Sequence, residues 1–400
     1  MNNSKKILLS GGWGYGNLGD DAILIASISL IREQFPNAEI IVFSYDTDYT
    51  KSIIPDFEVK LSVHREIYGK IAFKQLNTYK KVFNIYLLPN ILRRIYFKLF
   101  GRGFLDNDTN CEQAFSETQQ KISKQCESLF ERADIFIMSG GGYFNNWVES
   151  FISRCHELRL AKKYNVPAYI MGQTLDKFSS DKIPLAQKML SSVSGIYLRD
   201  SQSFSFLQSM GINSFVGPDL ALGFPTYGKA LDKNIVFIPA EVPKTSKIIL
   251  LRSVSDIAKK YSLAVKVCIT RLYCADIIDA CYFAKNLKKL GVKVIFKIPL
   301  DYNDMISDIT NSQYLISSNL HGLILGYISG SKILCLNKGW KFEAFMHQCN
   351  RDAFLLPLQD VSYKDIHEKI DSLINDTKSN GDKISELSNI VHTSFQLTFI

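Results

Sequence analysis

Several features are scarce or missing in this chain of 400 residues, and each absence narrows what the protein can be. No apolar run approaches the roughly 18–20 residues that a membrane-spanning helix needs. The first residues are charged and lead into the strand-like Ile7–Leu9, without the apolar stretch and cleavage site of a secretory signal. The eight cysteines form no C-x-x-C pair, and the six histidines show no metal-ligand spacing. We therefore expect a cytoplasmic protein with reduced thiols and no metal site.

The composition that remains is that of an ordinary water-soluble globular protein, with 46% apolar and 22% charged residues. A single core stops growing at about 250–300 residues, so a chain of this length predicts two domains. The net charge is +8, and it is not spread evenly. The stretch between Gly69 and Gly103 contains no acid, and its basic residues are Lys70, Lys74, Lys80, Lys81, Arg93, Arg94, Lys98 and Arg102.

Apolar runs of strand character alternate with polar breaks and helix-like segments, as is typical of a parallel sheet covered by helices. The predicted strands of the first half are Ile7–Leu9, Ile40–Phe43, Ile135–Met138, Ala168–Met171 and Ile196–Leu198. Those of the second half are Ile235–Ile238, Val265–Ile269, Val292–Ile298, Tyr314–Ser317 and Ile333–Leu336. Between the two sets, residues 223–228 are the linker candidate. We predict an α/β protein of two doubly wound, Rossmann-like domains that face a cleft. They comprise residues 1–224, with a basic helical insertion at about 68–125, and residues 225–400, with helices at the carboxyl end.

Glycine-rich or polar breaks follow several of the predicted strands. In the first half they are Gly11–Asn17, Gly140–Tyr143, Gly172–Thr174 and Arg199–Ser201, and in the second half Thr270–Arg271 and Ser318–Gly322. Turn formation explains each break singly. Because ligands of open α/β sheets bind beyond the carboxyl ends of the strands, we expect the breaks together to form a site.

The segment Gly14–Gly19 matches the G-x-G-x-x-G pattern of dinucleotide sites, after a strand and before a helix that we expect to begin near Asp21. Asp20 and Asp21 at the helix start would repel a bound pyrophosphate, which argues against a dinucleotide. We interpret the glycines as allowing close backbone approach. The carboxylates would cap the helix or accept hydrogen bonds from sugar hydroxyls. The residues that this helix should bury are Ile23, Ala26, Leu30 and Ile31.

The run from Gly11 to Leu24 resembles the amino-terminal signature of the polysaccharide pyruvyl transferase family. Further matches follow in the family's order at Gly140–Gly142, Gly172–Gln173, Arg199–Ser203, Pro218–Ala221, Leu320–Gly322 and Lys341–Met346. This resemblance implies a fold similar to GT-B and an enzyme of cell-surface polysaccharide synthesis, such as that of capsules and exopolysaccharides. Such enzymes move the enolpyruvyl carbons of phosphoenolpyruvate onto two sugar hydroxyls as a ketal and release phosphate.

The resemblance also implies roles for particular residues. His321 would be the general acid, and Arg199 would bind the donor and meet His321 across the cleft. The predicted donor-binding set is Arg199, Arg271, Asn319, Leu320 and Gly322. The predicted acceptor-binding set is Gly14, Gly16, Asn17, Asp20, Gly141, Gly142, Gln173 and Asp219. Phosphoenolpyruvate would be a co-substrate, and we expect no cofactor and no metal.

One position departs from the family pattern, because Asn319 stands where an arginine is usual. Asparagine cannot neutralise a dianion, so either another cation, with Arg271 first in line, replaces the arginine or the donor is a different molecule. Without the resemblance, His321 reads as a helix cap, Arg199 as a local ion pair with Asp200, and Asp219 as a turn cap. Two alternatives stay open: a GT-B glycosyltransferase that uses a nucleotide-sugar, and a non-catalytic glycan-binding scaffold.

The basic segment 69–103 interleaves its cations with apolar and aromatic residues. Such a stretch can lie on an anionic membrane surface or form an ordinary pair of surface helices. The expected partners are therefore a glycan or lipid-linked oligosaccharide acceptor and, through 69–103, the inner face of the cell membrane. Nucleic acid is not expected, since no recognised binding module accompanies the charge.

Overall fold

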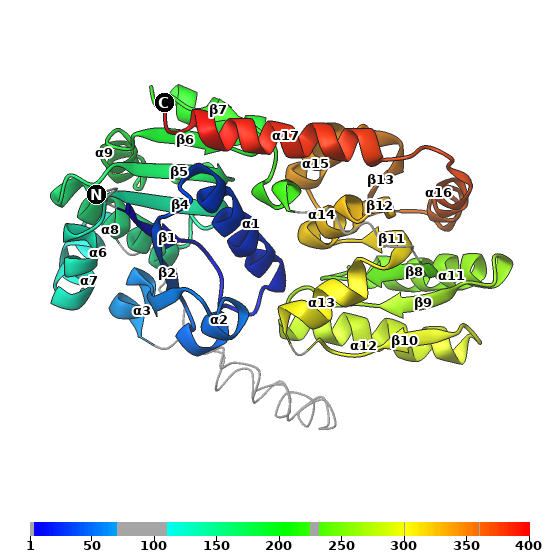
Figure 1. Ribbon diagram of the computed structural model, residues 1–400. Coiled ribbons are helices and arrows are strands. Elements are labelled where there is room, and N and C mark those ends of the chain that lie inside the picture. Colours follow the sequence, from blue (N-terminus) through cyan, green and yellow to red (C-terminus); the bar gives the residue numbers. More distant parts are fainter. Residues whose placement is uncertain (1–3, 70–109, 225–231, 300, 360) are drawn as a thin grey trace, which may run out of the picture. The chain divides into compact units, whose positions relative to one another are not determined.

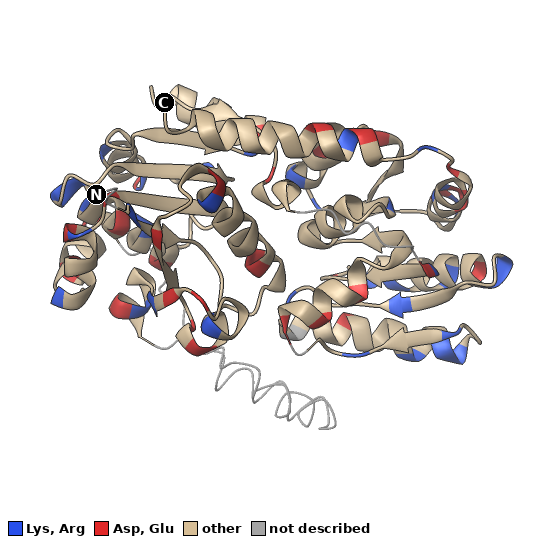
Figure 2. Ribbon diagram, viewed as in Figure 1, with Lys and Arg blue, Asp and Glu red and all other residues tan. Residues whose placement is uncertain are grey.

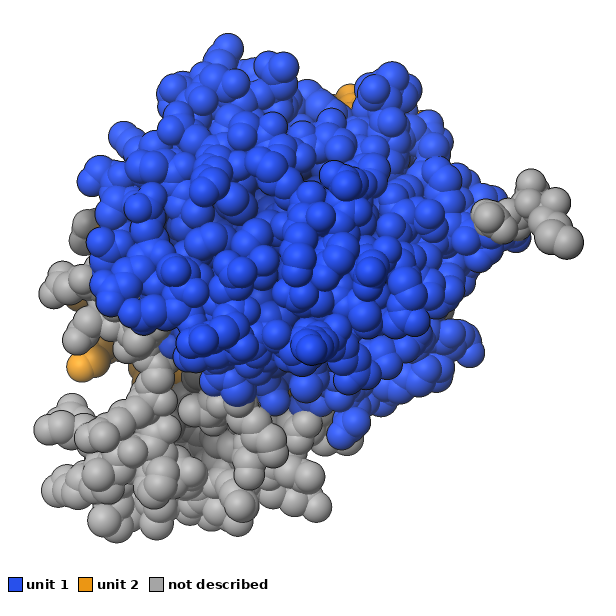
Figure 3. Space-filling model, turned by 90° about the vertical axis from the view of Figure 1, so that its left-hand side faces the viewer, with its two compact units in different colours: residues 1–16, 23–220, 392–400 blue, residues 17–22, 221–391 orange. Residues whose placement is uncertain are grey.

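Two parallel β-sheets with flanking helices make up the computed structural model, which describes residues 4–69, 110–224, 232–299, 301–359 and 361–400 (Figure 1). The chain divides into two compact units, coloured separately in Figure 3. Unit 1 comprises residues 1–16, 23–220 and 392–400, and unit 2 comprises residues 17–22 and 221–391. The two sheets confirm the predicted α/β class with two doubly wound sheets.

The sheet of unit 1 has seven strands in the order β3-β2-β1-β4-β5-β6-β7, all paired in parallel. Its strands are β1 (Lys6–Ser10), β2 (Glu39–Ser44), β3 (Glu58–Leu61), β4 (Ile135–Gly141), β5 (Ala168–Gln173), β6 (Gly195–Leu198) and β7 (Phe215–Val216). The order reverses between β1 and β4. In a doubly wound sheet this switch point is the usual place for a ligand, at the carboxyl ends of the strands.

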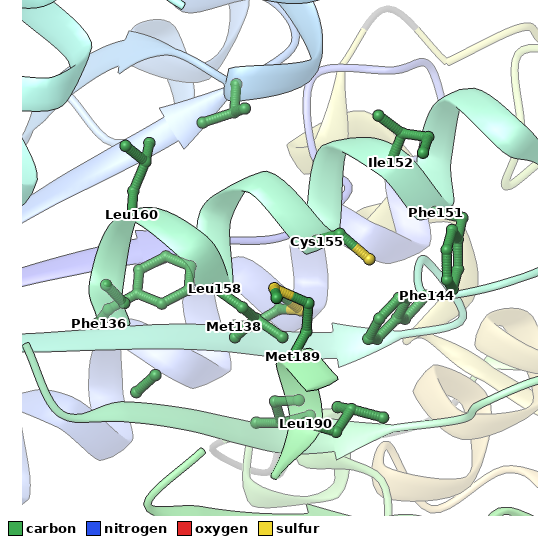
Figure 4. Close-up of a cluster of buried hydrophobic side chains, with 14 of the residues drawn as sticks. Phe136, Met138, Phe144, Phe151, Ile152, Cys155, Leu158, Leu160, Met189 and Leu190 are labelled. Atoms are coloured by element: carbon green, nitrogen blue, oxygen red, sulfur yellow. The ribbon is translucent and has the colours of Figure 1, made fainter. Parts of the chain in front are cut away.

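The helices of unit 1 are α2 (Thr47–Ile53), α3 (Val63–Tyr68), α6 (Cys111–Thr118), α7 (Lys124–Glu131), α8 (Val148–Lys163), α9 (Ile183–Leu190) and α10 (Ser201–Ser209). Helix α8 is buried along most of its length, and its side chains Cys155 and Leu158 point toward Met138 of β4 and Met189 of α9 (Figure 4). At roughly 25 cal/mol per Å² of apolar surface buried, this cluster is a main source of the unit's stability.

The sheet of unit 2 has six parallel strands in the order β10-β9-β8-β11-β12-β13. They are β8 (Asp232–Ile238), β9 (Ala264–Val267), β10 (Val294–Phe296), β11 (Ser312–Ser317), β12 (Lys332–Asn337) and β13 (Leu355–Pro357). The helices are α11 (Lys244–Lys260), α12 (Cys274–Lys289), α13 (Tyr302–Ile309), α14 (Leu320–Ile328), α15 (Trp340–Gln348) and α16 (Tyr363–Asn375). Here the order reverses between β8 and β11, which places the second switch point.

Two helices belong to both units. Helix α1 (Leu18–Gln34) begins in unit 2 and continues in unit 1, and α17 (Gly381–Leu397) begins in unit 2 and ends in unit 1. The expected start of α1 near Asp21 is wrong, because the helix begins at Leu18 and takes Asp20 and Asp21 into its first turn. Carboxylates are stabilising there, next to the unpaired amides of the helix start. Its predicted buried residues are confirmed, namely Ile23, Ala26, Leu30 and Ile31.

Each of the ten predicted strands overlaps an observed one, whereas β3, β7 and β13 were not predicted. All three are short strands at sheet edges, and their residues are largely half-buried or exposed. They therefore lack the continuous apolar run of a central strand. Most of the linker candidate and most of the predicted insertion, including its basic segment, lie outside the described residues. The described end of the insertion is helical, in α6 and the start of α7.

No helix in the described part of the chain has the length and apolar content needed to cross a bilayer. The described residues also contain no group of three or more His, Cys, Asp or Glu side chains that could hold a metal ion.

In unit 2, lysines end both α11 and α12 (Figure 2). They complement the negative ends of the helix dipoles, so helix stability explains their place.

Candidate functional site

In unit 2 the segments that follow four neighbouring strands meet at the switch point. The Oγ of Ser318, after β11, accepts a hydrogen bond from the backbone N–H of Ala240, after β8, at 2.8 Å. Lys338, after β12, donates to the carbonyl of Ala240 at 3.1 Å. Arg271, after β9, lies 3.0 Å from the carboxylate of Glu241. The carboxyl ends of β8, β9, β11 and β12 therefore present one cluster of polar and charged groups.

His321 lies in the first turn of α14, directly beyond β11, and is 9% exposed. The helix begins there because the Asn319 side chain accepts a hydrogen bond from the backbone N–H of Gly322 at 3.0 Å. Asn319 is thus the N-cap of α14. A Cβ at Gly322 would lie 2.5 Å from Cδ1 of Ile238, so glycine lets the helix start pack closely on β8.

Residues 17–22, at the start of α1, pack against this cluster. The backbone N–H of Leu18 donates to the carbonyl of Thr270 at 2.9 Å, and Asn17 forms a β-bridge with Arg271. These contacts bring the carboxylate of Asp20 to 3.6 Å from Nδ1 of His321. Asp20 is 4% exposed. Two predicted acceptor-binding residues, Asn17 and Asp20, therefore contact residues predicted to serve the donor.

Arg271 is held by two carboxylates. It forms a bidentate pair with Asp276, at 2.6 and 2.8 Å, and it also contacts Glu241. Glu241 in turn lies 3.5 Å from the ammonium group of Lys338. Burial and the nearby Arg271 lower the pKa of Lys338. Two cations and two carboxylates thus compensate one another at this edge of the sheet.

In unit 1, Arg199 follows β6 and forms an ion pair with Asp219, not with Asp200. Its Nε also donates to Oγ1 of Thr174 at 2.8 Å. Burial acts to lower the pKa of Arg199, but Asp219, together with smaller effects of Asp200 and Tyr143, raises that pKa above its ordinary value. Asp200 instead caps α10 by accepting from the N–H of Ser203 at 2.6 Å. The local ion pair of Arg199 with Asp200, which was the alternative to a donor-binding role, is thus wrong.

The other predicted residues of unit 1 lie at the ends of its strands. Gly14 and Gly16 have φ values of +76° and +84°, which favour glycine. Gly141 ends β4 with a φ of +91°, and the carbonyl of the next residue, Gly142, accepts a hydrogen bond from Asn145. Gln173 is fully buried and donates to the carbonyl of Ser139 at 3.1 Å, while its Oε1 has no hydrogen-bond partner among the described residues.

The structure therefore divides the predicted site residues between the units. Those of unit 2 are His321, Asn319, Leu320, Gly322, Arg271, Asn17 and Asp20, and those of unit 1 are Arg199, Asp219, Gly14, Gly16, Gly141, Gly142 and Gln173. Sequence reasoning missed Glu241, Asp276 and Lys338. Glu241 and Lys338 follow predicted strands closely, so the rule that was applied to the other strand ends could have found both.

A comparison with protein families finds that the model of the family described as polysaccharide pyruvyl transferase matches residues 17–337. The match begins at Asn17 and runs through the segments after β8, β9 and β11. No curated protein matches the chain in sequence.

Solved structures of similar fold cover nearly the whole chain. The S. aureus MnaA–UDP structure has 13% identity and a TM-score of 0.56, over 99% of this chain and 98% of that chain. UDP-N-acetylglucosamine 2-epimerase from Rickettsia bellii has 11% identity and a TM-score of 0.54, over 99% and 96%. Glycyrrhiza uralensis UGT73P12, solved with glycyrrhetinic acid 3-O-monoglucuronide, has 9% identity and a TM-score of 0.52, over 99% and 91%. At these identities the likeness shows the fold alone, which is the GT-B fold of glycosyltransferases and epimerases.

Proposed function

Because this chain belongs to the polysaccharide pyruvyl transferase family, we propose that it transfers a pyruvyl group from phosphoenolpyruvate to a glycan sugar as a cyclic ketal. The observation that carries the proposal is the place of His321. This imidazole lies at the switch point of unit 2, in the first turn of α14, where the family model also matches. A histidine there can supply a proton beyond the carboxyl ends of the strands.

The proposed reaction begins with proton transfer from His321 to the methylene carbon of the donor, which becomes a methyl group. The second carbon then accepts the oxygen of one sugar hydroxyl, and its bond to the phosphate oxygen breaks. Attack by the second hydroxyl closes the ketal. Of the two hydroxyl protons, one restores the proton of His321 and the other leaves with inorganic phosphate, so atoms and charge balance.

The donor carries a carboxylate and a phosphate, and both need fixed cations. We keep Arg199 as the proposed donor ligand. Arg271 is the proposed replacement for the arginine that Asn319 displaces. To bind phosphate, Arg271 would exchange its contact with Glu241, whose side chain is 49% exposed, and keep Asp276, whose side chain is 3% exposed. Releasing the exposed partner costs less, because water already solvates it.

The first test measures phosphate release from phosphoenolpyruvate with a panel of glycan acceptors and identifies the ketal by mass spectrometry. We expect turnover with at least one acceptor, and a loss of about 100-fold or more in kcat for His321→Gln, as is usual when a general acid is removed. His347→Gln is the matched control, because His347 is also in unit 2 but its side chain is 84% exposed. Failure of every acceptor, or full activity of His321→Gln, would contradict the proposal.

A nucleotide-sugar donor is the alternative, and Asn319 in the N-cap role favours it, since that position supplies no cation. Thermal unfolding with phosphoenolpyruvate or with several nucleotide-sugars separates the two donors. A ligand that binds only the native state raises the melting temperature, by an amount that grows with its concentration over its Kd. We expect a rise with phosphoenolpyruvate. A rise in melting temperature with a nucleotide-sugar but not with phosphoenolpyruvate would instead support a glycosyltransferase.

The acceptor is proposed to be a glycan, in free or lipid-linked form, as the polysaccharide family implies. Contact with the inner face of the cell membrane stays a prediction, because the basic segment 69–103 is almost entirely outside the described residues.

A further inference from the structure

The carboxylate of Asp20 and the imidazole of His321 form a buried pair that the proposed reaction does not yet use. Oδ1 of Asp20 lies 3.6 Å from Nδ1 of His321. The exposed fractions are 4% for Asp20 and 9% for His321, so water screens their interaction only weakly. Sequence reasoning placed Asp20 in the acceptor site, whereas in the structure its carboxylate lies against the imidazole of His321.

Two electrostatic effects on His321 oppose each other at this position. The start of α14 presents the positive end of a helix dipole, which disfavours a charged imidazole. A carboxylate within about 4–6 Å favours the charged form. A general acid must carry its proton before the donor is attacked. The helix start disfavours the protonated imidazole, and the carboxylate of Asp20 favours it.

The backbone around Asp20 fixes this arrangement. A Cβ at Gly19 would lie 2.3 Å from both Cβ and Nδ1 of His321, so the chain passes directly against the imidazole. The hydrogen bond from Leu18 to Thr270 and the bridge between Asn17 and Arg271 hold the same segment to the end of β9. Asp20 is therefore placed by contacts of the three residues that directly precede it, Asn17, Leu18 and Gly19.

We propose that Asp20 is a positioning residue, which keeps His321 protonated and turns Nδ1 toward itself so that Nε2 delivers the proton. This inference rests on the proposed role of His321 as general acid. It goes beyond that role because it identifies the group that keeps His321 protonated before any donor binds.

Other charged groups also lie on the segments around His321. They are Asp21 on α1, Arg271 and Asp276 after β9, Glu241 after β8, Lys338 after β12, and Asp301, Asp304 and Asp308 on α13, which packs against α14. Arg271, Asp276, Glu241 and Lys338 pair among themselves. Asp304 pairs with Lys297, and Asp308 with Lys266, while Asp301 caps its own helix. Among these groups Asp21 is the nearest along the chain to Asp20, so it provides the control.

The experiment titrates His321 in the full chain by NMR, with histidines labelled at the Cε1 position and the signal identified by its loss in His321→Gln. We expect Asp20→Asn to lower the pKa of His321 by about 1–3 pH units, the usual effect of one neighbouring opposite charge. Asp21→Asn removes the same charge from the same turn of α1 and should lower it by less than half as much. Asp20→Glu should stay close to the wild-type pKa. Equal titration in wild type and Asp20→Asn would overturn the proposal.

If Asp20→Asn fails to fold, Asp20→Ser gives the same comparison, because serine also suits a helix start.

A second readout is the pH profile of phosphate release. We expect Asp20→Asn to move the high-pH limb of kcat to lower pH by the shift seen in the titration, with little change in KM for the donor. An unchanged profile with a raised KM for the acceptor would overturn the proposal and return Asp20 to the acceptor site. The titration needs no donor, so a shifted His321 without turnover would refute the proposed function while still showing that Asp20 controls the pKa of His321.

Discussion

At the scale of single residues, the tightest constraint on the candidate acid is Gly19, since any Cβ there would overlap His321. Alanine is otherwise favourable in a helix, by roughly 0.5–1 kcal/mol over glycine. At Gly19 that gain is outweighed, because the added Cβ would lie 2.3 Å from Cβ of His321, which no rotation of the ring can move. We therefore expect Gly19→Ala to displace His321, to lower kcat at least about tenfold and to lower the melting temperature. Gly381→Ala, at the start of α17, is the control, because a Cβ there meets only Ser379 Oγ at 3.6 Å. Phosphate release and melting temperature measure both effects, and normal turnover of Gly19→Ala would show that the imidazole can tolerate the crowding.

Local sequence could predict the immediate setting of His321 but not its partner. An apolar strand followed by Asn319 and a helical run indicates a residue at a helix start, and the structure places His321 there. Asp20 and His321 are 301 residues apart in the chain, and no local pattern encodes a contact at that separation. The same holds for the contact of Arg271 with Glu241, which depends on tertiary packing. Its bidentate partner Asp276 is only five residues away, so that pairing was within reach of local reasoning.

At the scale of elements, α8 joins the core of unit 1 to its glycine-rich loop through a buried ion pair. Arg154 and Glu157 are each 1% exposed, and Arg154 also donates to Oγ of Ser10 and to the carbonyl of Gly11. Glu157→Gln leaves a buried guanidinium without its counter-charge, so we expect a loss of about 3–5 kcal/mol in the free energy of unfolding. The double variant Arg154→Met, Glu157→Met should lose clearly less than the sum of its two single variants. Urea unfolding of Glu157→Gln, of the two single methionine variants and of the double variant gives the four values, and strict additivity would show that the pair is not coupled.

Element prediction succeeded where burial on both faces gives a continuous apolar run, as in β4, whose residues are all buried. It missed three of the four edge strands, β3, β7 and β13, where only one neighbour and part of one face impose a pattern. Val216 of β7 is an exposed example. The start of α1 was misplaced because Asp20 and Asp21 were read as capping residues at the helix start, although carboxylates are equally typical of the first turn.

At the scale of the whole molecule, the glycine-rich and polar strand ends were expected to form one site, and the structure assigns them to two units. The chain order gave no sign that residues 17–22 would join the second unit, since they follow β1 of the first directly. That assignment comes from backbone contacts with Thr270 and Arg271. These contacts place Asp20, from the run Gly11 to Leu24, beside His321 of the match at Leu320–Gly322.

The stability of unit 1 should depend on pH through His156, which is buried on α8. Its Nδ1 accepts a hydrogen bond from Nε of Arg159 at 3.2 Å, and its Nε2 lies 2.9 Å from Oγ1 of Thr118. A second ring proton on Nδ1 would face the guanidinium, so the ring must stay neutral. Burial, and then Arg159, lower the pKa of His156 from its ordinary 6.5 to about 3.

Between those two values the unfolded chain binds a proton at His156 that the folded chain does not. The free energy of unfolding therefore falls as the pH falls below about 6.5, by up to about 1.4 kcal/mol per pH unit for this residue. Urea unfolding in a Trp340→Phe background follows unit 1, because the other two tryptophans, Trp13 and Trp147, both belong to it. We expect His156→Gln to be less stable at pH 7 but to lose less stability between pH 7 and pH 5, whereas the exposed His347→Gln keeps the wild-type slope. Equal slopes for His156→Gln and the parent protein would mean that His156 takes up a proton in the folded state, against the hydrogen bond that Arg159 donates to it.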